Sequence, residues 1–140
     1  MLSYNEPMGQ SGLKFPQGFL FGAATSAHQV EGNTTNQWSA WEDAHAERLA
    51  AEAARKTWDP DILARTPSPL QKENYISGSA CDHYNRFEAD FDIAKSLGHN
   101  AHRLSIEWSR IEPRKNSFDE REVEHYRKVM RALRARGMEP

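Results

Sequence analysis

Three hydrogen-bonding side chains follow a run of apolar and small residues near the start of the chain. The run reads FLFGAATSA over residues 19–27, and His28, Gln29 and Glu31 come directly after it. Apolar residues followed by small ones are typical of a strand packed closely on both faces. Burying such polar groups without partners costs a few kcal/mol each. The sequence therefore indicates that these three side chains find partners at the end of a buried strand.

A second polar set lies in the stretch AHRLSIEW, residues 101–108, whose side chains alternate in character. This period of two predicts a strand with one apolar and one polar face. The apolar face consists of Leu104, Ile106 and Trp108, and we expect Trp108 to lie in the core. The polar face consists of Arg103, Ser105 and Glu107. Ser105 and Glu107 are expected to serve interior packing and hydrogen bonding.

The remaining segments predict helices on either side of this second strand. Capping residues at 79–82 precede an apolar stripe that ends at Gly98, and a capping box at 117–120 precedes a stripe that ends at Gly137. Residues 33–78 form an unusually long connection, which is expected to hold an alanine-rich helix over 43–56 and an irregular proline-containing segment after it. Residues 138–140 then begin a further strand.

This order of elements predicts an α/β fold with a parallel sheet covered by helices. A barrel explains the polar face of residues 101–108 better than an open sheet does, because a barrel strand directs polar groups inward toward a site at its carboxyl end. An edge strand with one face in water is the alternative.

Composition excludes several classes of function. The 18 Lys and Arg residues against 20 Asp and Glu give a net charge of −2, which is not the basic footprint of a nucleic-acid or anionic-membrane partner. Neither a leader peptide nor a membrane-spanning segment is expected, so we predict a cytoplasmic protein. Cys81 is the single cysteine, which fits a reducing compartment. His99 and His102 lack a third ligand nearby, so no metal site is expected.

Three stretches resemble family 1 of the glycoside hydrolases, the β-glucosidase family. FLFGAATSAHQVEG is similar to the family's N-terminal signature, although Asn33 stands where the signature has a small residue. ACDHYNRFEADFDIAKSLGHNAHRLSIEWSRIEP is similar to its first barrel helix and second strand, and RALRARGMEP to the end of its second helix. The resemblance implies a partial (β/α)8 TIM barrel over residues 15–140, comprising the first two strand–helix units and the start of the third strand. It leaves residues 1–14 as a flexible N-terminus and about 33–78 as a long loop.

The resemblance also implies roles for four residues. Gln29 is expected to bind two adjacent hydroxyls of a sugar through its amide, with bonding to the loop backbone as the alternative. His28 and Glu31 are expected in a supporting role, either orienting the sugar-binding groups or tying the strand end to its neighbours. Arg103 is expected to lie beside the nucleophilic carboxylate, with an internal ion pair to Glu107 as the alternative.

The family's reaction is retaining hydrolysis of a β-glycosidic bond, which uses two carboxyl groups and no cofactor. The family's acid/base Glu follows the fourth strand and its nucleophile follows the seventh, and both strands lie beyond the predicted elements. Asn5, Glu6 and Pro7 match the letters of the acid/base motif but precede the first strand, so they are not expected to be catalytic.

We therefore expect the N-terminal part of a retaining β-glycosidase whose substrate is a β-glycoside or oligosaccharide. The 140 residues alone are predicted to be inactive and marginally stable. A non-catalytic carbohydrate-binding or interaction module, the remnant of a degenerate gene, is the alternative.

Overall fold

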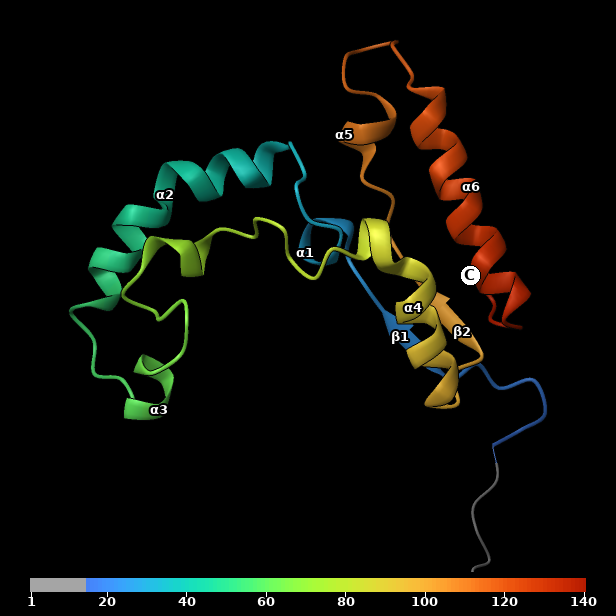
Figure 1. Cartoon of the computed structure of the whole chain (residues 1–140), viewed down its shortest axis with the longest axis horizontal. Helices are drawn as coiled ribbons and strands as arrows, with labels where there is room; N and C mark the ends of the chain where they lie inside the picture. The colour runs from blue at the N-terminus through green and yellow to red at the C-terminus, as the bar shows by residue number, and fades with distance from the viewer. Residues whose placement is uncertain (1–14) are drawn as a thin grey trace, which may run out of the picture.

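The computed structural model describes residues 15–140, so Asn5, Glu6 and Pro7 lie outside the described part of the chain. Two short parallel strands and two long helices form one unit, and an arm of further helices extends to one side (Figure 1). In chain order the elements are β1 (Gly22–Ala24), α1 (Ala27–Val30), α2 (Gln37–Ala53), α3 (Pro60–Leu63), η1 (Lys72–Tyr75), α4 (His83–Ser96), β2 (Ala101–Arg103), α5 (Trp108–Ile111) and α6 (Glu120–Ala135).

The two strands pair in parallel, with Gly22 opposite Ala101 and Ala24 opposite Arg103. A Cβ on Gly22 would lie 1.9 Å from the carbonyl oxygen of Ala101, so this close approach requires glycine. On the other side of β2, Ala101 forms a parallel bridge with Glu139. A third parallel segment thus begins where the sequence predicts one.

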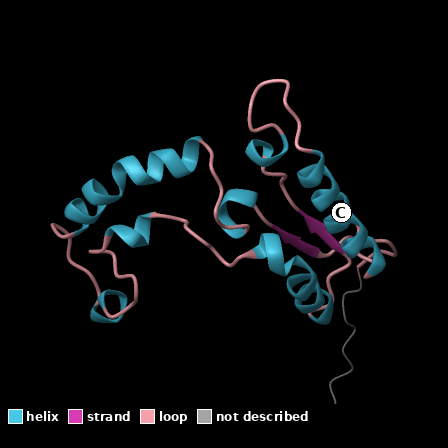
Figure 2. Ribbon diagram, turned by 45° about the horizontal axis from the view of Figure 1, so that its top comes forward, coloured by secondary structure: helices cyan, strands magenta, loops and turns pink. Residues whose placement is uncertain are grey.

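Helices α4 and α6 pack against each other and cover one face of β2 (Figure 2). Their shared core contains Phe91, Val129, Leu133 and Met138, with Leu104 packed against it. His102 is buried on the same face, with its ring 5.3 Å from that of Phe91. Because side chains alternate along a strand, Arg103 points to the opposite face, where it is exposed.

The three long helices lie where the sequence predicts them, with corrections at their ends. Helix α2 ends at Ala53 rather than residue 56, and the N-cap residue of α4, Asp82, makes no side-chain capping bond, contrary to the capping predicted at 79–82. Helix α2 begins at Gln37, before the predicted residue 43, because Asn36 caps it and forms a capping box with Ser39. Asp119, not Ser117, caps α6, since its carboxylate accepts the backbone N–H of Arg121.

The strand predictions are wrong in extent and burial. Strand β1 holds only three residues, all exposed, and the chain then turns into α1, so Gln29 lies on a helix rather than at the strand's end. Strand β2 ends at Arg103, and Glu107 caps α5 by accepting the N–H of Ser109. This turn removes Trp108 from the strand's apolar face, and the residue is 58% exposed instead of core.

The first and last residues of the arm formed by residues 33–78 lie next to each other. The N–H of Asn33 donates to the carbonyl of Gly78 over 2.7 Å, and α2 packs against η1 within the arm. Gly32, at φ +79°, lies so close to Ser79 that a Cβ would meet its carbonyl oxygen at 2.0 Å. Within residues 15–140, no helix combines the length and the apolar character that a bilayer crossing requires.

Candidate functional site

Arg103 lies at the carboxyl end of β2, and Gln29 lies on α1, the helix that follows the carboxyl end of β1. Arg103 is the last residue of β2, and its carbonyl accepts the N–H of Thr25 over 2.9 Å just after β1. Gln29 follows on α1, and both side chains are exposed. The carboxyl ends of parallel strands are where ligands bind in α/β folds, so the two predicted site residues occupy a suitable edge.

Helix α1, which carries Gln29, is a single turn without a side-chain cap from Ser26. A turn this short does not hold itself together in water, so its orientation depends on tertiary contacts. One contact comes from β2's side of the site, where the Ser105 hydroxyl accepts the N–H of Ala27 over 2.7 Å. Ser105 thus takes part in hydrogen bonding, the general role expected for it, with a partner that the sequence does not specify.

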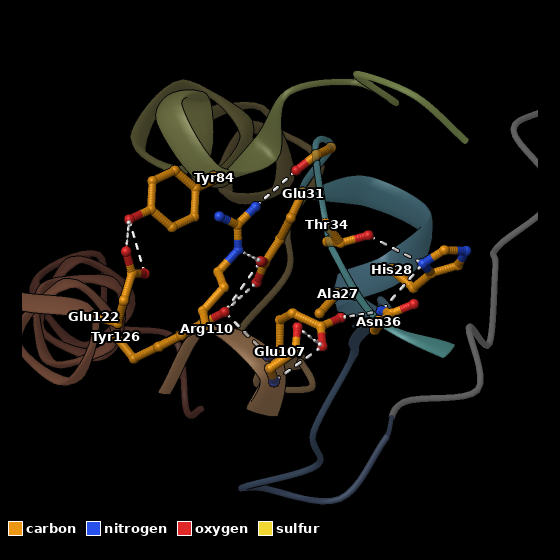
Figure 3. A network of polar contacts seen from close by, with 12 residues as sticks. Ala27, His28, Glu31, Thr34, Asn36, Tyr84, Glu107, Arg110, Glu122 and Tyr126 are labelled. Carbon is orange, nitrogen blue, oxygen red and sulfur yellow. Dashed lines mark hydrogen bonds and ion pairs between the residues drawn. The ribbon is translucent and has the colours of Figure 1, made fainter. Parts of the chain in front are cut away.

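The His28 imidazole is held at both ring nitrogens. Its Nδ1 lies 3.1 Å from the Thr34 hydroxyl and 3.4 Å from Asn36 Nδ2 (Figure 3). Its Nε2 lies 2.9 Å from a carboxylate oxygen of Glu42 and 3.2 Å from the Ser77 hydroxyl. His28 therefore ties α1 to the arm rather than to the sheet.

Glu31 points away from the arm, into a buried cluster (Figure 3). The Tyr126 hydroxyl lies 2.9 and 3.0 Å from its two carboxylate oxygens, and Arg110 Nε donates to it over 3.1 Å. The Arg110 guanidinium also donates to the carbonyl of Gly32 over 2.7 Å. Glu31 thereby joins α1 to α5 and α6.

Burial governs the ionisation of this cluster. Desolvation raises the pKa of Glu31 above its usual 4.5, although Tyr126 and Arg110 act in the lowering direction. The Arg110 guanidinium lies 4.2 Å above the Tyr84 ring, whose hydroxyl donates to Glu122. Burial and this carboxylate raise the pKa of Tyr84 to about 12.

Glu107 does not pair with Arg103, so the alternative role considered for the arginine is wrong within the described residues. The Glu107 carboxylate is buried and accepts hydrogen bonds from Asn36 (2.8 Å) and from the Ser109 hydroxyl (2.8 Å). Its backbone N–H donates to the Tyr126 hydroxyl over 3.0 Å. Arg103 is left with an exposed guanidinium at the site.

The arrangement holds two kinds of polar group, buried carboxylates bonded to protein donors and side chains exposed at the surface. Glu31 and Glu107 are its two buried carboxylates, and both are occupied by protein donors. Neither is placed as a nucleophile or as a proton donor to a bound molecule. What faces outward is an amide, Gln29, and a cation, Arg103.

Sequence reasoning missed the residues that hold this site together. They are Asn36, Glu42, Ser77, Arg110 and Tyr126. One signal was available, because a tyrosine within an apolar helical stripe usually finds a partner for its hydroxyl when it is buried. For Glu42 and Ser77, 35 residues apart in the chain, the sequence carries no such signal.

Comparisons with known proteins agree on one family. The sequence model of the family described as glycosyl hydrolase family 1 matches residues 11–140 of this chain. β-Glucosidase A of Thermotoga maritima is 33% identical over 128 residues, which is 91% of this chain and 25% of that protein. β-Glucosidase 34 of Oryza sativa subsp. japonica is 34% identical over 137 residues, 97% of this chain and 24% of that protein.

The solved structures lead to the same family. A β-glycosidase from Pyrococcus horikoshii is 38% identical with a TM-score of 0.66, over 90% of this chain and 24% of that one. The GH1 β-glucosidase from Exiguobacterium antarcticum is 30% identical with a TM-score of 0.66, over 91% of this chain and 25% of that one. The chain thus spans about a quarter of the length of the relatives it matches.

Proposed function

The chain belongs to glycosyl hydrolase family 1, and we propose that it supplies the sugar-binding start of a retaining β-glycosidase. The substrate class is a β-glycoside or an oligosaccharide with a β-linked terminal sugar. The names of the relatives, β-glucosidases and a β-glycosidase, support this class.

The fold proposed for residues 15–140 is the first part of a (β/α)8 barrel. Strand β1, helix α4, strand β2, helix α6 and the bridge at Glu139 follow the alternation of such a barrel. Both helices cover one face of β2, and Arg103 lies on the other, which would be the barrel interior. Since β2 has a parallel neighbour on each side, β1 and the segment at Glu139, it is not an edge strand, and this supports a barrel over an edge strand with one face in water.

The observation that carries the proposal is the exposure of both Arg103, at the carboxyl end of β2, and Gln29, on the helix that follows the adjacent parallel strand β1. Gln29 presents an amide oxygen and nitrogen, which match the acceptor and donor of two neighbouring sugar hydroxyls. Arg103 presents a guanidinium, which would keep a nearby carboxylate ionised and aimed at the anomeric carbon. That carboxylate and the general acid come from outside these residues.

The activity of the chain itself is the first test. Retaining hydrolysis requires a nucleophile and an acid about 5 Å apart, and Glu31 and Glu107 are occupied by protein donors. The purified 140-residue chain is therefore expected not to hydrolyse 4-nitrophenyl β-glucoside. Hydrolysis above that of a mock purification would show that the catalytic pair is present and the proposal wrong on this point.

The role of Gln29 is tested in a chimera in which residues 15–140 replace the matching quarter of Thermotoga maritima β-glucosidase A. Gln29→Ala should lower kcat/KM for the glucoside at least ~10-fold, equivalent to ~1.4 kcal/mol of lost transition-state stabilisation. Gln17→Ala, an exposed glutamine ahead of β1, is the matched control and should leave kcat/KM unchanged. Equal kinetics for both variants would remove Gln29 from the sugar site.

A further inference from the structure

Glu42, on α2, has a largely buried carboxylate that is surrounded by three hydrogen-bond donors. It accepts the Ser77 hydroxyl over 2.6 Å, the Ser77 backbone N–H over 2.9 Å and His28 Nε2 over 2.9 Å. The side chains of His28 and Glu42 are each 15% exposed. Desolvation opposes ionisation of Glu42, but the hydrogen bonds from Ser77 and His28 outweigh it and lower the pKa of the carboxyl. Glu42 is therefore an ionised acceptor.

An ionised carboxylate accepts hydrogen bonds only, so its contact fixes the proton of His28 on Nε2. Nδ1 is then an acceptor, and its two neighbours fit that assignment. The Thr34 hydroxyl can donate to Nδ1. Asn36 Nδ2 carries two protons, so it can donate one to His28 Nδ1 and the other to the Glu107 carboxylate. Every member of the set has compatible donors and acceptors only if His28 is the Nε2–H tautomer.

The same geometry argues against a hydrolytic triad. In a triad the carboxylate and the hydroxyl bond to opposite ring nitrogens, and the imidazole takes the proton of the hydroxyl. Here Glu42 and Ser77 both contact Nε2, and Ser77 donates its proton to Glu42. The imidazole is therefore not placed to take the proton of the Ser77 hydroxyl, and the cluster acts as a clamp on the ring.

We propose that Glu42 is a positioning residue, which with Ser77 locks His28 in the Nε2–H form and so fixes helix α1 in the orientation that presents Gln29. The importance of this orientation for sugar binding rests on the proposed function; the lock itself does not. His28 and Gln29 are adjacent on a single turn that has no side-chain cap. A clamp on one residue of such a turn restrains the next.

The first test is spectroscopic and uses the 140-residue chain. Long-range ¹H–¹⁵N spectra should show His28 protonated at Nε2, and Glu42→Ala should shift it toward the tautomer mixture of a free imidazole. His45, also on α2, is the internal control because its Nδ1 lies 2.7 Å from the carbonyl oxygen of Trp41. It should show the opposite tautomer in both proteins. A His28 protonated at Nδ1 in the unmodified chain would overturn the proposal.

The second test measures how firmly α1 is held. In Glu42→Ala, the amides of Gln29, Val30 and Glu31, which bond within the turn, should exchange at least ~10-fold faster. Amides of α6 should not change. Glu47→Ala is the matched control, since this glutamate on the same helix has an 83% exposed side chain and contacts only Lys72 among its described ion pairs.

If α6 amides accelerate equally in Glu42→Ala, the residue supports the whole fold and the proposal is wrong. Should that variant fail to fold, Ser77→Ala decides, because it removes one donor and leaves the carboxylate and the backbone contact in place. It should speed exchange in α1 alone, by a smaller factor. Unchanged α1 exchange, or a parallel rise in α6, would contradict the proposal.

The third test links the clamp to Gln29 in the chimera. Glu42→Ala should lower kcat/KM about tenfold when Gln29 is present and have almost no effect in the Gln29→Ala background. Additive losses would show that Glu42 does not act through Gln29. If Gln29→Ala alone is silent while the spectroscopic tests succeed, the positioning role stands and the proposed sugar contact fails.

Discussion

Replacing Tyr126 by Phe removes one oxygen atom that contacts two polar groups, the Glu31 carboxylate and the Glu107 backbone N–H. The hydroxyl lies 2.9 and 3.0 Å from the two carboxylate oxygens of Glu31 and accepts the backbone N–H of Glu107 over 3.0 Å. All three residues are buried. No water can readily replace the lost oxygen, so we expect Tyr126→Phe to destabilise the chain well beyond an ordinary surface change.

The size of the effect follows from these contacts. A buried N–H left without an acceptor costs about 1–3 kcal/mol, and a hydrogen bond to a charged group contributes about 1.5–3 kcal/mol. Since Arg110 still donates to Glu31, we take the lower part of both ranges. Tyr126→Phe should therefore lower the free energy of unfolding by about 3 kcal/mol at pH 7.

The loss should depend on pH in a defined direction. Burial raises the pKa of Glu31 in the folded chain, and Tyr126 is one of the groups that limits this rise. Removing the hydroxyl raises that pKa further, so ionising Glu31 costs the variant more than the parent. The difference in stability should shrink as pH falls below the folded-state pKa of Glu31, where both folded proteins carry the protonated carboxyl, and grow as pH rises through that pKa.

Urea unfolding followed by circular dichroism at 222 nm, repeated at several pH values, measures both the loss of unfolding free energy and its dependence on pH. Tyr75→Phe is the matched control, because the Tyr75 hydroxyl makes one hydrogen bond, to the carbonyl of Pro69. It should cost about 1 kcal/mol without a pH trend. A Tyr126→Phe loss no larger than that of the control, or one that is constant between pH 4.5 and 7, would refute the reasoning.

Two further predictions concern the backbone and the core. Gly32→Ala should destabilise the chain by clearly more than Gly98→Ala in urea unfolding, since both have positive φ but only Gly32 places a Cβ against backbone, 2.0 Å from the carbonyl oxygen of Ser79. The His102 ring should titrate below 6.5 by NMR, because burial lowers its pKa, with His83 and His99 adding to the effect. Its contribution to stability is then present above pH 6.5 and is lost as pH falls through the folded-state pKa; a midpoint at or above 6.5 would contradict this.

Periodicity predicts the long elements of this chain and fails at the short ones. Helices α4 and α6 carry apolar stripes over three or more turns, so the helical period is recognisable even where one residue departs from it. Strands β1 and β2 have three residues each, too few for alternation to set their ends. The apolar alternation through Trp108 is interrupted because Glu107 starts a helix by capping it, a local hydrogen bond that period-two reasoning does not include.

The candidate site also has a part that the sequence predicts and a part that it does not. The sequence singles out Gln29 and Arg103, and the structure leaves both exposed, Arg103 at the carboxyl end of β2 and Gln29 on the helix that follows β1. It does not single out their supports, because these come from distant parts of the chain: Glu42 lies 14 residues after His28, and Tyr126 lies 95 after Glu31. Such pairs depend on how the arm and α6 fold back, which no local pattern records.

The three polar residues after the first strand have different partners, and this division explains why all three are there. His28 is bound by the arm through Glu42 and Ser77, and Glu31 by α5 and α6 through Arg110 and Tyr126. Gln29, between them, is exposed. A one-turn helix has too few internal hydrogen bonds to fix its own direction, so anchors on two sides supply that direction. The buried Glu31 and the partly buried His28 therefore fix the turn from two sides, and Gln29 is the residue of the three that stays exposed and that we propose to contact a ligand.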